Sequence, residues 1–132
     1  MATTVLIVDD NHSFRAWARV LLERAGYTVA GEAADGASAI AVALESSPEV
    51  VLLDVQLPDT DGFEVTRRLR AERSDVAVVL TSTREALDYG AKLGSSGAVG
   101  FLSKDELSAE AFAEVLAGGR GSDTTGGAAA KA

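Results

Sequence analysis

Cysteine is absent from this sequence, so neither a disulfide nor a thiolate metal site can form. The N-terminal stretch MATTVLIVDD lacks the basic region and the cleavage site of a secretory signal. Long hydrophobic runs are missing too, because no apolar stretch approaches the roughly 20 residues of a membrane-spanning helix. These absences predict a cytoplasmic protein that does not insert into a membrane.

Positive charge is also scarce. Lys and Arg number 12 against 20 Asp and Glu, which gives a formal charge of −8 and disfavours non-specific attraction to nucleic acid. The 132 residues, 47% of them hydrophobic, suffice for one packed domain and are too few for two ordinary ones. We expect one domain over residues 1–117. Residues 118–132 are glycine-rich and lack apolar periodicity, so we expect a disordered tail there.

Short β-branched runs recur along the chain, separated by longer alanine-rich segments. The runs occupy residues 4–8, 28–33, 49–54, 76–81 and 98–102. Strict alternation of strands with helices implies right-handed crossovers, and hence a mostly parallel sheet between two helical layers. The continuous apolar run VVLL at residues 50–53 is typical of a strand buried on both faces. The sequence therefore predicts a three-layer α/β/α fold.

Local signals predict where the helices begin and end. Side chains that can accept hydrogen bonds from helix amides stand at three expected N-termini: Asn11 or Ser13, Asp35, and Asp61, where Glu64 three residues later resembles a capping box. Gly26 after Ala25 and the proline at position 48 are expected to stop the first and second helices.

The last two predicted helices differ in quality. The fourth, from about Arg84 to Leu93, has Gly90 in its interior, which costs a helix about 1 kcal/mol relative to alanine. We therefore expect it to be short or mobile. The fifth is predicted from Ser108 to Ala117.

Polar side chains follow four of the predicted strands. Asp9 and Asp10 come after the first, Asp54 ends the third, Thr81 ends the fourth, and Lys104 follows the fifth. Ligands of open parallel sheets bind beyond the carboxyl ends of the strands, where the strand order reverses. We expect these five side chains to share that edge.

Crowded carboxylates repel one another, and their burial raises their pKa unless a cation compensates. Mg²⁺ prefers oxygen ligands and usually takes only one or two carboxylates, which leaves room for a phosphoryl oxygen. The Lys104 ammonium and the Thr81 hydroxyl could complete a phosphate site. One central carboxylate could itself attack phosphorus and form an aspartyl phosphate.

The stretches LIVDDN, VVLLDVQLPDTDG, VVLTS and GFLSKDEL together resemble the four signatures of a bacterial two-component response regulator receiver domain, in order and at appropriate spacings. The resemblance covers roughly residues 3–117. It implies a flavodoxin-like (βα)5 fold with a five-stranded parallel sheet of order 2-1-3-4-5.

The resemblance implies a role for each matching position. Asp54 matches the phospho-acceptor, which is also a metal ligand, and Asp10 matches a direct Mg²⁺ ligand. Asp9 matches a second acidic residue that acts largely through metal-bound water. Gln56 matches the position that lends its backbone carbonyl to the metal.

Three further positions match the phosphate-responsive part of the family. Thr81 matches the hydroxyl that reorients toward the phosphoryl group, and Lys104 matches the lysine that pairs with that group. Phe101 matches the aromatic switch residue. The resemblance thus implies that Asp54, Thr81 and Lys104 carry the phosphoryl chemistry.

The resemblance also implies partners. A sensor histidine kinase or a phosphotransfer protein would supply the phosphate, and the receiver would catalyse only its own phosphorylation and dephosphorylation. The output would be docking to a downstream protein target, with the chain a monomer or a phosphorylation-dependent homodimer. Asp105 after Lys104 is typical of receivers joined to helix-turn-helix domains, so a receiver fragment of a DNA-binding transcription regulator is an alternative. A third alternative is a flavodoxin-like phosphohydrolase. Such enzymes generally need a cap or a substrate pocket, and five short strand–helix units leave few residues to form one.

Other residues have simpler interpretations. His12, beside the acidic pair, is expected to be a solvated helix-start residue rather than a metal ligand. Phe14 and Trp17 are expected to serve packing or surface contact. Tyr89 suits a partner surface and simple exposure equally well.

Overall fold

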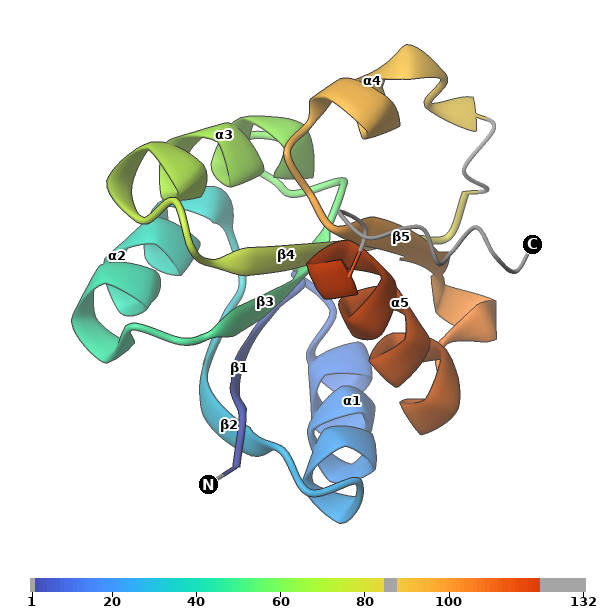
Figure 1. Ribbon diagram of the computed structural model, residues 1–132. Helices are drawn as coiled ribbons and strands as arrows, with labels where there is room; N and C mark the ends of the chain where they lie inside the picture. The colour runs from blue at the N-terminus through green and yellow to red at the C-terminus, as the bar shows by residue number, and fades with distance from the viewer. Residues whose placement is uncertain (1, 85–87, 122–132) are drawn as a thin grey trace.

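The computed structural model describes residues 2–84 and 88–121, which form five parallel strands alternating with helices (Figure 1). The sheet order is β2-β1-β3-β4-β5, as predicted. The strands lie within two residues of the predicted ranges: β1 (Thr4–Val8), β2 (Thr28–Ala33), β3 (Val50–Asp54), β4 (Ala77–Ser82) and β5 (Gly100–Ser103). The chain therefore has the flavodoxin-like fold.

Helices cover both faces of the sheet, which confirms the three layers (Figure 1). On one face lie α1 (His12–Arg24) and α5 (Ala109–Gly121). On the other lie α2 (Gly36–Ser46), α3 (Gly62–Glu72) and α4 (Ala91–Ser95). Among the helices in the described part of the chain, none is both long and apolar enough to span a bilayer.

The predicted central strand is β3, and every one of its residues is buried. Leu53 packs with the apolar residues beneath α2 and α3, whereas Leu52 packs with those beneath α1 and α5. Consecutive strand residues face opposite sides of a sheet, so a strand between two helical layers must be apolar at every position. This explains the run that precedes Asp54.

Most of the predicted helix ends are confirmed. Asn11, rather than Ser13, caps α1 by accepting a hydrogen bond from the Phe14 amide at 3.0 Å. Asp35 caps α2 in the same way, accepting from the Ser38 amide at 2.8 Å. Both caps satisfy amide groups that the first helical turn leaves without partners.

The predicted fourth helix is wrong in its extent. It was expected to run from Arg84 through Gly90, but α4 begins only at Ala91, and residues 85–87 lie outside the described residues. Gly90 has φ +58° and ψ −134°, a backbone conformation that no α-helix contains and that favours glycine. The glycine therefore precedes the helix instead of weakening its middle.

The C-terminal part differs from the prediction at two places. A 3₁₀ turn, η2 (Lys104–Glu106), follows β5 and was not predicted. Helix α5 continues to Gly121, past the expected end at Ala117. The rest of the predicted tail, residues 122–132, lies outside the described residues.

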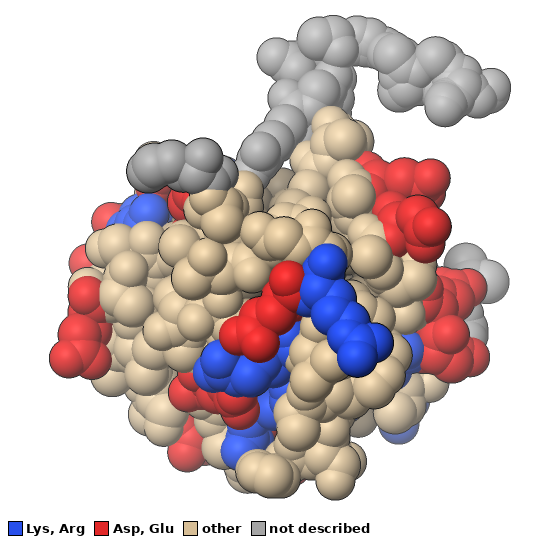
Figure 2. All heavy atoms as spheres, turned by 90° about the horizontal axis from the view of Figure 1, so that it is seen from below, with Lys and Arg blue, Asp and Glu red and all other residues tan. Residues whose placement is uncertain are grey.

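Charges of both signs are mixed on the surface. On the face shown in Figure 2, Lys and Arg side chains lie beside Asp and Glu side chains. Arg15 and Arg19 of α1 both bind Glu32 of β2, with N–O distances of 3.0 and 2.7 Å. The two arginines are thus paired within the chain and connect the first helix to the edge strand.

Candidate functional site

The predicted site residues meet at the carboxyl edge of the sheet. β1 and β3 are neighbours in the sheet, and from β1 the chain crosses to β2 on one side, whereas from β3 it crosses to β4 on the other. Asp9 directly follows β1, and Asp54 ends β3 opposite Thr81 of β4. This is the point where strand order reverses, at which open α/β sheets bind their ligands.

The acidic residues at this edge form a cluster. Asp9, Asp10 and Asp54 each offer a carboxylate oxygen, and these oxygens lie within 4.8 Å of one another. Asp9 is fully buried and Asp54 is 5% exposed, whereas Asp10 is open to solvent. They adjoin a hollow of about 250 Å³ lined by Asp10, Asn11, Asp54, Gln56, Thr83 and Lys104. The cluster is therefore open to solvent at Asp10, while the other two carboxylates are buried.

Lys104 provides the positive charge of the cluster. Its Nζ lies 2.6 Å from Asp9 Oδ2 and 3.5 Å from Asp54 Oδ2, and 4.5 Å from the centre of the Phe14 ring. Burial alone would lower the pKa of Lys104, but the two carboxylates outweigh it and the net shift is upward. The lysine is therefore a fixed cation at neutral pH.

Asp54 is held in an unfavourable environment for its charge. Its pKa is raised to about 6, first by burial and then by the neighbouring charge of Asp9, while Lys104 partly opposes the rise. Hydrogen bonds from backbone amides fix both acids: Gln56 donates to Asp54 Oδ1 at 3.2 Å and Asn11 donates to Asp9 Oδ1 at 2.9 Å. The carboxylates are thus held close together despite their repulsion.

This donor set fits a hard divalent cation. One ammonium faces three carboxylates, so the cluster keeps an excess of negative charge, and the ligand atoms are all oxygen. A cation bound there would offset both the burial and the neighbouring charge of Asp9, which together raise the pKa of Asp54. The acidic triad is consistent with a Mg²⁺ site.

Thr81 is the register partner of Asp54, whereas Phe101 lies one strand farther along the sheet, on β5. Thr81 is fully buried, and its Oγ1 makes no hydrogen bond within the described residues. Phe101 is half-buried, with its ring 5.9 Å from that of Tyr89. A buried hydroxyl without a partner is costly, so Thr81 is ready to bind an acceptor that enters the site.

Tyr89 has more contacts than the sequence indicated. Its hydroxyl and the Ser82 hydroxyl share a hydrogen bond of 2.6 Å, and its ring meets the ring of Phe63 edge-on at 5.5 Å. It therefore connects β4 to α3 and to Phe101 at once. The sequence pattern could not predict these contacts, because Ser82, Phe63 and Phe101 belong to three different elements.

Arg15 is another residue that the sequence analysis missed. Its guanidinium donates to the backbone carbonyl of Asp9 at 2.7 Å while also binding Glu32. Its position in the sequence, a few residues after Asp9 and Asp10, is the signal that could have identified it as a neighbour of the site. His12, by contrast, is the exposed first residue of α1, as predicted.

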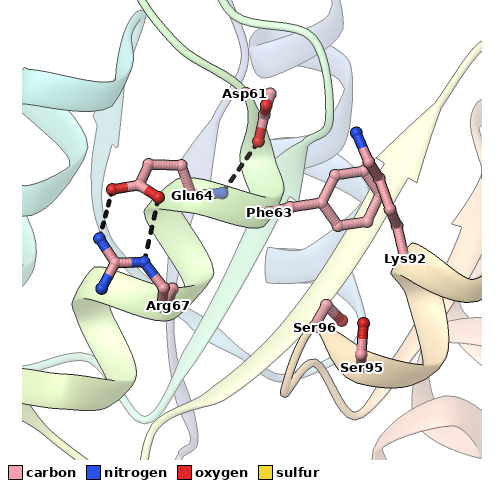
Figure 3. A pocket seen from close by; sticks show the side chains of 7 residues that line it. All are labelled: Asp61, Phe63, Glu64, Arg67, Lys92, Ser95 and Ser96. Atoms are coloured by element: carbon pink, nitrogen blue, oxygen red, sulfur yellow. Dashed lines mark hydrogen bonds and ion pairs between the residues drawn. The ribbon is translucent and has the colours of Figure 1, made fainter.

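A second hollow, of about 290 Å³, separates α3 from α4 and is lined by Asp61, Phe63, Glu64, Arg67, Lys92, Ser95 and Ser96 (Figure 3). Two of its lining residues, Asp61 and Glu64, were predicted to form a capping box, and only one of the two hydrogen bonds of that box is present. Asp61 accepts from the Glu64 amide at 2.9 Å, but the Glu64 carboxylate binds Arg67 at 2.6 and 3.0 Å. A bidentate guanidinium is a stronger partner than a backbone amide, so it captures the carboxylate.

Residues 5–116 match the model of the response regulator receiver domain. The chain belongs to this family. The receiver is 35% identical over 120 residues to the response regulator GacA of Pseudomonas aeruginosa, an alignment that covers 88% of this chain and 56% of GacA. The chain spans about half the length of the curated relatives it matches.

Solved structures agree with this assignment. A LuxR-family two-component response regulator from Aurantimonas sp. SI85-9A1 superposes on the receiver with a TM-score of 0.82 at 30% identity, over 92% of this chain and 87% of that one. The chemotaxis response regulator CheY4 of Vibrio cholerae gives 0.77 at 28% identity, over 90% and 99%. A phosphoacceptor switch is the function that the family implies, and its members are generally not true enzymes.

Proposed function

We propose that this receiver is a Mg²⁺-dependent switch in which Asp54 accepts a phosphoryl group from a sensor histidine kinase or a phosphotransfer protein. The observation that carries the proposal is the position of Asp54. It ends a fully buried strand, beside a second buried carboxylate and 3.5 Å from the Lys104 ammonium. A nucleophile on so rigid a mount is held in one orientation toward an incoming phosphorus atom.

Each residue of the cluster has a distinct part in the transfer. The Asp54 carboxylate attacks phosphorus, a phosphorus–oxygen bond forms, and the phosphorus–nitrogen bond to the donor histidine breaks. Asp9, Asp10, Asp54 and the backbone carbonyl of Gln56 would hold a Mg²⁺ ion, which neutralises charge on the phosphoryl oxygens when bound. Lys104, a cation fixed between Asp9 and Asp54, is within reach of a phosphoryl group on Asp54. Hydrolysis returns Asp54 to its free carboxylate.

The switch would use the partnerless hydroxyl of Thr81. A phosphoryl oxygen on Asp54 gives Thr81 Oγ1 an acceptor, because the two residues are register partners on neighbouring strands. Movement of Thr81 toward it changes the space beside Phe101, which is only half-buried. Phosphorylation would thus shift the population toward a form with a different α4–β5–α5 face, which a downstream protein target reads.

The test is direct phosphorylation by a small donor. The chain is incubated with acetyl phosphate and Mg²⁺ and its intact mass is measured; we expect one added phosphoryl group. Asp54→Asn should block the addition, whereas Asp35→Asn, at the N-cap of α2, should not. A wild-type chain that stays unmodified, or an Asp54→Asn chain that is modified to the same extent, would refute the proposal.

A second candidate is that the receiver regulates a DNA-binding domain of the same protein. Its support is that this chain covers 56% of GacA and resembles a LuxR-family regulator of known structure. The sequence encoded after residue 132 distinguishes a receiver that acts as a separate protein from one that is joined to a DNA-binding domain. A helix-turn-helix domain there favours the second candidate, and an immediate stop codon favours a separate receiver. A phosphohydrolase has no such support.

A further inference from the structure

The loop between β3 and α3, residues 55–61, is tied to a distant helix through Asp59. Asp59 Oδ1 accepts a hydrogen bond from the Gly36 amide at 2.8 Å, and its Oδ2 accepts from the Ala37 amide at 3.0 Å. Both amides belong to the first turn of α2. One carboxylate therefore connects two segments that are 23 residues apart in the sequence.

This contact is more than a helix cap. The N-terminus of α2 already has its own cap, since Asp35 accepts from the Ser38 amide at 2.8 Å. Asp59 is a second carboxylate at the same terminus, and it is supplied by the loop that carries Gln56. The two amide hydrogen bonds lower the pKa of Asp59, so it is ionised at neutral pH.

Close packing at Gly36 is an independent sign that the loop is seated on α2. A Cβ atom at this position would lie 2.3 Å from Thr60 Cγ2 and 3.3 Å from Asp59 Oδ1. A contact of 2.3 Å is far below van der Waals separation, so any side chain at position 36 would have to displace the Thr60 methyl group. Both Asp59 and Thr60 take part in this contact.

The loop is also closed on itself, so its outer end and its base move together. The Leu57 amide donates to the Thr60 carbonyl at 3.2 Å, and Gln56 forms a bridge with Asp61. At the base, the Gly62 amide donates to the Val55 carbonyl at 2.6 Å. A shift at Asp59 is therefore transmitted to Gln56, which lines the hollow beside Asp54.

We propose that Asp59 is a positioning residue for the metal site: by fastening the loop to α2, it keeps the Gln56 carbonyl in place for Mg²⁺. This inference rests on the proposed function, because it assumes that the acidic cluster binds that ion. Asp59 itself is exposed and is not proposed as a ligand. Its effect is the one expected of groups that orient metal ligands from outside the coordination sphere.

The experiment compares two carboxylates at one helix terminus. Mg²⁺ binding is measured by calorimetry for wild type, Asp59→Ala, Asp59→Asn and Asp35→Ala, and amide hydrogen exchange is measured on the same proteins without metal. Asp59→Ala should weaken Mg²⁺ binding about 10-fold and speed exchange at Leu57 and Gly62. Asp59→Asn keeps one acceptor oxygen and should fall in between.

Asp35→Ala is the matched control, because it removes the same charge and one helix cap while leaving the loop fastened. It should change the Mg²⁺ dissociation constant less than 2-fold and leave loop exchange unchanged. Equal effects from Asp35→Ala and Asp59→Ala, or wild-type behaviour in Asp59→Ala, would overturn the inference. A wild-type chain that binds no Mg²⁺ would instead refute the proposed function, while metal-free exchange would still report on the anchor.

Gly36→Ala tests the same anchor from the side of the helix. It retains both carboxylates but places a methyl group where the Thr60 side chain now lies. We expect faster exchange at Leu57 and Gly62 and weaker Mg²⁺ binding than wild type. Wild-type exchange rates in this variant would also overturn the inference.

Discussion

At the scale of single residues, Asp54 is held where its negative charge is poorly solvated. Burial and the charge of Asp9 raise its pKa to about 6 from 3.8, so its ionised form is disfavoured in the folded chain. A solvent-exposed aspartate would ionise more easily but would gain less from a bound cation, because water screens its charge. The burial and the neighbouring charge that disfavour the ionised form of Asp54 are therefore the same conditions under which a bound cation would stabilise that form most.

The first prediction concerns stability and pH without metal. Because the pKa of Asp54 is higher in the folded chain, the folded state binds a proton more tightly, and stability falls as pH rises from about 4 to about 6. Asp54→Asn should remove this loss. At pH 8 it should raise the free energy of unfolding by roughly 3 kcal/mol at most, measured by urea denaturation.

The same comparison at pH 4 supplies the control, because Asp54 is then protonated and the gain should shrink toward zero. Asp75→Asn, at a side chain that is 80% exposed, should have little effect at either pH. A gain from Asp54→Asn that is the same at pH 4 and pH 8 would contradict the electrostatic explanation.

The second prediction concerns metal addition. An ion that binds only the folded chain stabilises it by mass action, by about 2.7 kcal/mol at 100 times its dissociation constant. We expect Mg²⁺ to raise the melting temperature at pH 8 and to have much less effect at pH 5, where Asp54 is mostly protonated. Chelation should reverse the gain. An equal shift with Asp54→Asn would show that the ion binds elsewhere.

At the scale of helices and strands, the sequence predicted the features that depend on neighbouring residues. The run of residues 50–53 identified a strand with two buried faces, Asp35 was identified as a helix cap, and the cap of the first helix was narrowed to Asn11 or Ser13. These features depend on a few adjacent residues, whose preferences are known. The gathering of Asp9, Asp54 and Lys104 followed from topology once the strands were recognised.

Features that depend on competition or on distant partners were missed. Glu64 could bind either the helix terminus or Arg67, and only the folded geometry decides between them. The positive φ of Gly90, because of which the fourth helix begins later than predicted, depends on the path of the chain into α4. The contact from Asp59 to α2 spans 23 residues and leaves no local pattern.

The third prediction concerns Tyr89, which links three elements. Tyr89→Phe removes the hydrogen bond to Ser82 but keeps the ring between Phe63 and Phe101. It should cost about 1 kcal/mol of unfolding free energy, and a double-mutant cycle with Ser82→Ala should show that the two losses are not additive. NMR line widths of Phe101 should report a more mobile ring.

The control is Tyr27→Phe. Its ring also packs edge-on against a phenylalanine, Phe112, but its hydroxyl makes no hydrogen bond within the described residues. Its loss should be smaller than that of Tyr89→Phe. Additive losses at Tyr89 and Ser82 would mean that the hydroxyl pair contributes nothing to the position of Tyr89.

At the scale of the whole molecule, the site depends on two cores that share one sheet. Leu53 belongs to the core beneath α2 and α3, and the adjacent Leu52 belongs to the core beneath α1 and α5. Asp54 follows both in the same strand. Loosening of either core would therefore move Asp54, and we expect the two layers to behave as one unit.

The fourth prediction tests this unity. Leu52→Ala and Leu53→Ala each leave a cavity in one core and should each cost about 2 to 5 kcal/mol. Because β3 is common to both cores, each variant should still unfold in one transition, with coincident urea curves from far-UV circular dichroism and from the fluorescence of Trp17 on α1. If Leu53→Ala unfolded in two steps, with Trp17 reporting only the later one, the layers would be independent. The acidic cluster would then owe its geometry to one core alone.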